Sequence, residues 1–142
     1  MSTGESSVAQ GPLTCVVVTP EMTVLETKAD FLVLPLFDGE LGVDRRHSPM
    51  IGRLGFGELR IRSEGQLQRF YVDGGFVQVA GDVVSILTDR ALPASEVDQV
   101  AAEAQLQSAF EQPVSGQEQL AIRERNIARA RGQIRVAQRA SA

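Results

Sequence analysis

The chain has very few of the side chains from which most active sites are built. It has one cysteine, Cys15, and one histidine, His47, among 142 residues. A single cysteine excludes an internal disulfide, and one residue of each type cannot supply the ligands of a structural zinc site. Cys15 lies in the apolar run 13–18, which predicts a buried, unreactive thiol. With no nucleophile motif present, the sequence predicts no catalytic residue, no metal site and no cofactor. Binding of Mg or Ca by the oxygens of Asp38, Glu40 and Asp44 is the less favoured alternative to acids that flank a tight turn.

Long hydrophobic runs and an excess of basic residues are also missing. The apolar runs are strand-sized and interrupted by charges, whereas a membrane-spanning helix needs about 20 consecutive apolar residues. The 18 acidic residues outnumber the 14 basic ones, for a net charge of -4. Because an acidic chain offers no broad basic surface, we expect neither nucleic acid nor anionic lipid as a direct partner. The small polar residues 1–12 predict a disordered leader and not a signal peptide.

Residues 13–92 have the pattern of short β-strands. Within 57–63, Leu59 and Ile61 alternate with Arg60 and Arg62, as expected of a strand with one buried face. Turn pairs separate the strand-like runs at Asp38-Gly39, Glu64-Gly65, Gly74-Gly75 and Gly81-Asp82. The pair at 74–75 predicts a bulge or a close backbone approach. Many short strands without crossover helices predict an antiparallel β-sandwich domain and exclude a parallel α/β sheet.

After Pro93 the composition changes to Ala, Gln, Glu and Arg, which are good helix formers. We expect a first helix that begins at an N-cap on Ser95 and ends near residue 110. A second helix is expected at about 117–139. The two would form an antiparallel hairpin domain over 93–142, so the predicted fold class is α+β in two consecutive parts.

Charge divides between the two expected helices. Residues 95–118 carry five acids and no base (-5), and residues 119–142 carry six arginines and one glutamate (+5). The second helix has an apolar stripe a heptad apart at Leu120, Ile127 and Ile134, which we expect to pack on the first helix. Four arginines lie opposite that stripe: Arg125, Arg129, Arg135 and Arg139. We therefore expect them to face outward and interpret them as a surface for an acidic protein, with a merely solvated face as the alternative and nucleic acid a distant third.

Five motifs in a fixed order resemble a known family. They are DGELGV (38–43), HSP (47–49), YVDGGFVQV (71–79), VSILTDRA (84–91) and SEVD (95–98). Taken together and followed by a helical pair, they resemble the epsilon subunit of the F-type ATP synthase over about residues 13–98. Each motif is weak alone, and the ordered set is specific.

The resemblance implies a non-catalytic subunit of the central stalk. Its partners would be the gamma subunit, the c-ring and the catalytic alpha/beta hexamer, at the cytoplasmic face of the energy-transducing cell inner membrane, where it is peripheral. It would couple proton-driven rotation to ATP synthesis, and its hairpin would restrain ATP hydrolysis, as in many members of that family. The alternative from another class is a stand-alone β-sandwich module whose hairpin recruits an acidic protein.

The resemblance also assigns partner contacts to particular residues. On the c-ring and gamma side it predicts Glu40, Arg45, Arg46, His47 and Pro49. Arg45-Arg46 replaces the Pro-Gly pair that usually precedes the histidine. We hypothesise that Asp44 pairs with one of these arginines and masks its charge. On the hairpin, the resemblance implies that the four arginines opposite the apolar stripe meet acidic segments of the catalytic subunits.

A nucleotide motif of some bacterial members is degraded in this chain. Those members bind ATP through Ile/Leu-Asp-x-x-Arg-Ala, and the matching run here is VDQVAA (97–102). The run keeps Asp98 and Ala102 but places Ala101 where the arginine belongs. Because the missing guanidinium would be the main phosphate-pairing group, we expect weak or absent ATP binding.

Overall fold

The computed structural model describes residues 12–141, so the predicted leader lies almost wholly outside the described residues. Eight strands come first in the chain. They are β1 (Leu13–Val18), β2 (Thr23–Ala29), β3 (Phe31–Leu36), β4 (Gly39–Val43), β5 (Met50–Ser63), β6 (Gln66–Ala80), β7 (Val83–Leu87) and β8 (Ala91–Pro93). A short 3-10 turn η1 (Ala94–Glu96) then leads into helices α2 (Gln99–Glu111) and α3 (Gln117–Ala140).

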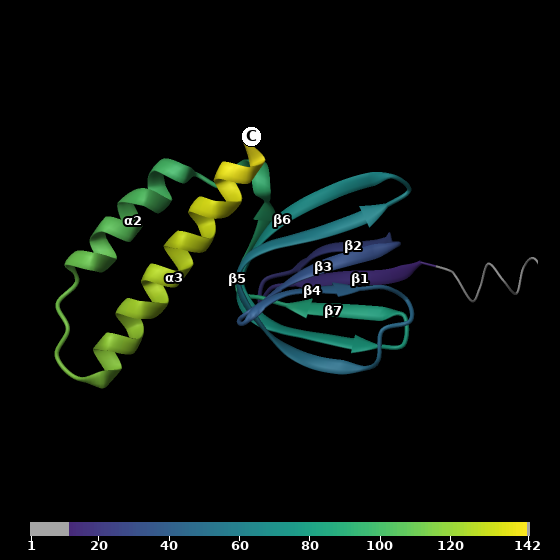
Figure 1. Ribbon diagram of the computed structural model, residues 1–142, viewed down its shortest axis with the longest axis horizontal. Coiled ribbons are helices and arrows are strands. Elements are labelled where there is room, and N and C mark those ends of the chain that lie inside the picture. The colour runs from purple at the N-terminus through teal and green to yellow at the C-terminus, as the bar shows by residue number, and fades with distance from the viewer. Residues whose placement is uncertain (1–11, 142) are drawn as a thin grey trace, which may run out of the picture.

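Two long strands build the sandwich from a single curled sheet. The strand order is β2-β1-β7-β6-β5-β3-β4, with β8 also paired to β6. The first half of β5 pairs with the second half of β6, and β7 pairs with that half of β6 on its other side. The second half of β5 pairs with the first half of β6 on one side and with β3 on the other. The strands thereby fold into two layers around one core (Figure 1). The predicted sandwich is confirmed, although β1 and β7 form one parallel pair.

Alternating strand residues fill the core, as the sequence pattern predicts. Leu13, Cys15 and Val17 of β1 are fully or almost fully buried, and the residues between them are only partly so. Leu59 and Ile61 of β5 lie in the same core. Burial raises the pKa of the Cys15 thiol to about 12, which keeps it protonated and agrees with the expected inert side chain.

The glycine pair at 74–75 marks a close approach between strands. Gly75 has φ +106°, and a Cβ there would collide with the carbonyl oxygen of Leu87. Its register with Leu54 continues the ladder between β5 and β6. Of the two expectations for this pair, the close backbone approach is therefore confirmed. Only glycine fits both the left-handed backbone and the space.

The helical hairpin is confirmed, but its first cap is not where the sequence predicts it. Ser95 lies within η1, and Val97 is extended, so the chain straightens before α2 begins. Asp98 is the N-cap instead, and its Oδ1 accepts a hydrogen bond of 3.0 Å from the backbone N–H of Ala101. The prediction of Ser95 was wrong because a 3-10 turn and one extended residue separate β8 from the helix.

Helix α3 lies between α2 and the sandwich (Figure 1). Arg123 reaches from α3 to the last turn of α2, where Nε donates to the Ala109 carbonyl at 3.1 Å and Nη2 to the Phe110 carbonyl at 3.3 Å. These bonds satisfy carbonyls that an α-helix leaves unpaired at its C-terminus. On its other side α3 packs on β5, β6 and η1. Within residues 12–141, no helix is long and apolar enough to span a membrane.

Candidate protein-interaction site

Glu40, predicted to face the c-ring, lies on β4 and is held by an arginine of β5. Its two carboxylate oxygens accept hydrogen bonds of 3.1 Å each from Nη1 and Nη2 of Arg60. This bidentate bond is the main reason why the pKa of Glu40 is lowered, and the charges of Arg60 and Arg139 lower it further. Glu40 is therefore a fixed, ionised group on a strand and not a mobile loop side chain.

The loop between β4 and β5 holds the other predicted stalk contacts. Asp44 accepts from the backbone N–H of Arg46 at 2.9 Å and from Arg46 Nη2 at 3.4 Å, which confirms the hypothesis that Asp44 pairs with an arginine. The backbone bond is the first cause of the lowered pKa of Asp44. The Arg46 side chain nevertheless stays 89% exposed. The His47 backbone N–H donates to the Asp44 carbonyl at 3.1 Å and closes the turn that leads to Pro49.

Three of the four hairpin arginines pair with acids of the sandwich, so the prediction that all four face outward is wrong. Arg129 Nε lies 3.0 Å from Asp73 Oδ1. Two further ion pairs cross the same interface: Arg125 with Asp89 at 3.8 Å, and Arg139 with Glu58 at 3.5 Å. Arg135 borders a groove between α3 and the sandwich. The helical period separates the arginines from the apolar stripe correctly, but it cannot show that the sandwich covers the arginine side.

We call the surface where α3 and η1 pack on β5 and β6 the joint. Its apolar part is a small cluster centred on Tyr71 of β6, Ala94 of η1 and Val136 of α3. Gly132 provides the closest approach, because a Cβ there would lie 2.9 Å from the Phe56 carbonyl carbon and nearer still to its oxygen. Glycine at this position lets α3 sit directly on the backbone of β5.

Polar contacts complete the joint. The Tyr71 hydroxyl donates to Asp73 Oδ1 at 2.7 Å, and the same oxygen accepts from Arg129 Nε at 3.0 Å. Tyr71 is fully buried, and its burial followed by the bond to Asp73 raises its pKa far above the usual range. Gln133, one turn after Arg129, also hydrogen-bonds to Tyr71. We call Tyr71, Asp73, Arg129 and Gln133 the clasp.

A second acid, Glu58, lies beside the clasp on β5, where it is the cross-strand neighbour of Tyr71. Its side chain is only 3% exposed. Three arginines surround it: Arg60 at 3.1 Å, Arg139 at 3.5 Å and Arg69 at 3.9 Å. A buried carboxylate requires such compensation, and here two of the three cations belong to the sandwich itself.

Sequence reasoning missed Tyr71, Asp73 and Glu58. All three lie on the strand face that the alternation predicts to be outside the core, where polar residues need no explanation. The available signal was a tyrosine and two acids on one strand face of a chain whose last helix is rich in arginine. That signal becomes visible only when the helix is known to cover that face.

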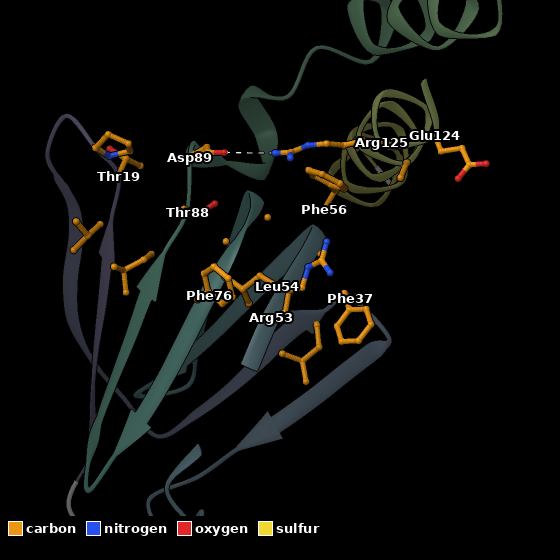
Figure 2. A pocket seen from close by; sticks show the side chains of 18 of the residues that line it. Thr19, Phe37, Arg53, Leu54, Phe56, Phe76, Thr88, Asp89, Glu124 and Arg125 are labelled. Carbon is orange, nitrogen blue, oxygen red and sulfur yellow. Dashed lines mark ion pairs between the residues drawn. The ribbon is translucent and has the colours of Figure 1, made fainter. Parts of the chain in front are cut away.

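An apolar groove of about 1420 Å³ opens next to the joint. Its apolar side chains include five large ones from the β3–β4 turn, β5, β6 and β7, namely Phe37, Leu54, Phe56, Phe76 and Leu87. Figure 2 shows Phe76, Leu54 and Arg53 close together on the neighbouring strands β6 and β5, with Phe37 beyond Arg53 and with Phe56 next to Arg125 of α3. Phe37, Phe76 and Leu87 are exposed by 64%, 58% and 51%. Large apolar side chains gathered in an exposed groove are typical of a protein-binding surface.

The residues of the degraded nucleotide motif form the N-cap and the first turn of α2. Asp98 caps the helix, Ala101 is exposed, and Ala102 is buried with 1% exposure. The Asp98 carboxylate is therefore engaged by the helix backbone. The phosphate-pairing guanidinium that the motif requires is absent from position 101.

The fold defines a two-part chain, a β-sandwich followed by a helical hairpin, with an exposed groove where the two parts meet. A family model described as the ATP synthase delta/epsilon chain, beta-sandwich domain, matches residues 12–94. The ATP synthase epsilon chain of Rhodopirellula baltica is 52% identical over 121 residues, which cover 85% of this chain and 94% of that one. The epsilon chain of Nitrosococcus oceani is 37% identical over 126 residues, 87% of this chain and 90% of the relative.

Solved structures show the same fold at low identity. A chain in the Euglena gracilis mitochondrial ATP synthase (OSCP/F1/c-ring) has a TM-score of 0.72 and 23% identity, covering 92% of this chain and 81% of its own length. A chain in the central stalk and c-ring of the Tetrahymena thermophila mitochondrial ATP synthase has a TM-score of 0.67 and 15% identity, covering 91% and 96%. The chain belongs to the ATP synthase delta/epsilon family, as the ordered motifs indicate.

Proposed function

We propose that this chain is the epsilon subunit in the central stalk of a rotary F-type ATP synthase. The observation that carries the proposal is the 52% identity to an epsilon chain over 94% of that relative, which includes both the sandwich and helical residues. The subunit has no catalytic role of its own. It works at the cytoplasmic face of the membrane, which it reaches through its partners.

The apolar groove is the surface for the gamma subunit. Its exposed phenylalanines and Leu87 are flanked by Arg53, Arg125 and Asp89, which gives an apolar centre with a charged rim. Specific protein interfaces have this anatomy. The β4–β5 loop, with Arg45, Arg46, His47 and Pro49, and the ionised Glu40 on β4 serve the c-ring side.

In the docked hairpin, three of the four predicted contact arginines are paired with acids of the sandwich. Arg129 is bound by Asp73, and Arg125 and Arg139 also have acidic partners on the sandwich. Restraint of ATP hydrolysis by this hairpin therefore requires that α3 leave the joint. Once released, the same arginines are available to acidic segments of the alpha/beta hexamer.

Capture of the tagged chain from its native cell tests the proposal. We expect gamma and the c-ring subunit to be recovered with the wild type. Phe76→Asp, which places a charge in the groove, should lower the recovered gamma by about tenfold, since charge in an interface centre is strongly unfavourable. Val100→Asp is the matched control, because Val100 is 76% exposed on α2. A chain that ends at residue 94 should still capture gamma, and its complex should hydrolyse ATP faster.

Recovery of neither gamma nor c-ring by the wild type would contradict the stalk function and favour a stand-alone binding module. Equal loss of gamma with Phe76→Asp and Val100→Asp would contradict the assignment of the groove. An unchanged hydrolysis rate for the truncated chain would leave the stalk function and remove the inhibitory one.

A further inference from the structure

The contact between hairpin and sandwich is built from small and polar residues. The residues of α3 that are buried are Ala130, Gly132, Gln133, Val136 and Ala137. They contain one medium-sized apolar side chain, that of Val136, which packs in the small cluster around Tyr71. Because little apolar area is available to hold the hairpin, polar contacts decide how firmly it docks.

Among these polar contacts, the ion pair of Arg129 is the least replaceable. Asp73 is 8% exposed as a residue, and Arg129 is the one cation paired with it among the described residues. Glu58 would keep Arg60 and Arg69 if Arg139 were lost. The pair between Arg125 and Asp89 is mostly exposed, at 57% and 65%, and such pairs contribute little. The Arg129 side chain is 30% exposed, but the Asp73 carboxylate is nearly buried, and leaving such a carboxylate without its cation costs more than breaking an exposed pair.

We propose that the clasp is the switch that keeps the hairpin docked, with Asp73 of the sandwich holding Arg129 of α3 in place of an outside acidic partner. Tyr71 and Asp73 stand two residues apart on one face of β6, and the Tyr71 hydroxyl donates a hydrogen bond to Asp73 Oδ1. The sandwich alone therefore positions the carboxylate that accepts from Arg129. Arg129 and Gln133 stand one turn apart on α3, where Arg129 bonds to Asp73 and Gln133 to Tyr71. An acidic partner and Asp73 then compete for one guanidinium, and weakening the clasp releases the hairpin.

Tyr71 makes the switch directly measurable. It is the only tyrosine, and the chain has no tryptophan, so its fluorescence reports on this position alone. When α3 is docked, the ring is fully buried. Undocking removes Val136 and Gln133 from the ring and its hydroxyl. Quenching of the tyrosine fluorescence by acrylamide therefore measures the undocked fraction in the full chain.

The test compares Arg129→Gln with Arg125→Gln, a matched variant one turn earlier on the same helix. We expect Arg129→Gln to raise the undocked fraction by at least about tenfold and Arg125→Gln to leave it near that of the wild type. Arg129→Lys keeps the charge and should restore most of the protection. Far-UV circular dichroism checks that α2 and α3 stay helical. Protection of Tyr71 in Arg129→Gln, or equal exposure in both glutamine variants, would overturn the proposal.

The physiological role of the clasp rests on the proposed inhibition of ATP hydrolysis by the hairpin. The variant Asp73→Asn tests the clasp and that inhibition separately. This variant removes the charge that holds Arg129 but leaves Arg129 itself intact. We expect Tyr71 to become quenchable in the isolated chain and ATP hydrolysis to fall in the assembled synthase. Greater quenching with unchanged hydrolysis would support the clasp and refute inhibition by the hairpin. Unchanged quenching would refute the clasp, whatever the hydrolysis rate.

Discussion

Replacement of Gly132 by alanine tests whether α3 needs direct backbone contact with β5. In a free helix the change is favourable by about 1 kcal/mol, because glycine is a poor helix former. In the docked hairpin the new Cβ would lie 2.9 Å from the carbonyl carbon of Phe56 and from its Cβ. A backbone carbonyl cannot rotate away as a side chain can, so α3 itself must move. Overpacking of this kind costs about 1–3 kcal/mol.

The two effects act on different states and can be measured separately. The docked state should lose about 1–3 kcal/mol relative to the undocked state, while helix content is kept or increased. Acrylamide quenching of Tyr71 reports docking, and far-UV circular dichroism reports helix content. We therefore expect Gly132→Ala to expose Tyr71 without loss of helical signal.

Ala128→Gly is the opposite substitution on the same helix and serves as the control. Ala128 is exposed, so this change should cost about 1 kcal/mol of helix stability and leave docking largely unchanged. The reasoning would be refuted if Gly132→Ala left Tyr71 as protected as in the wild type and raised the free energy of unfolding by the full helix-propensity gain. The carbonyl of Phe56 would then not limit how close α3 comes.

Two further predictions concern Glu40 and the nucleotide motif. Arg60 lowers the pKa of Glu40 in the folded protein below its unfolded pKa near 4.5. The ionised carboxylate therefore stabilises the fold at pH values above 4.5, and this stabilisation is lost as the pH falls through the folded pKa. Because Glu40 is about half exposed, Glu40→Gln should lower the free energy of unfolding by less than about 1 kcal/mol at pH 7, and by less still at pH 3 in urea titrations; an equal loss at both pH values would contradict the ion pair. For ATP, calorimetry on the isolated chain should detect no binding at micromolar nucleotide, since Ala101 supplies no guanidinium, and a clear micromolar signal would show that other residues replace it.

The sequence alone determined most of the local structure. Strand alternation placed Leu59 and Ile61 in the core, and helix-forming composition after Pro93 predicted the hairpin. These features depend on neighbours a few residues away, so a local pattern contains them. The N-cap was misplaced because serine and aspartate are both good N-cap residues. The choice between Ser95 and Asp98 depended on the 3-10 turn η1 after β8, which includes Ser95 and delays the start of α2.

The tertiary structure decided what the arginine face of α3 is for. Helical periodicity separated Arg129 from the apolar stripe, yet the same periodicity fits a helix that turns its arginines to solvent or to another surface. Only the docking of α3 on β5 and β6 turned Tyr71, Asp73 and Glu58 from ordinary surface residues into buried partners. The physical reason is that burial of a charge depends on which distant segment covers it. The order of residues along one helix or strand does not carry that information.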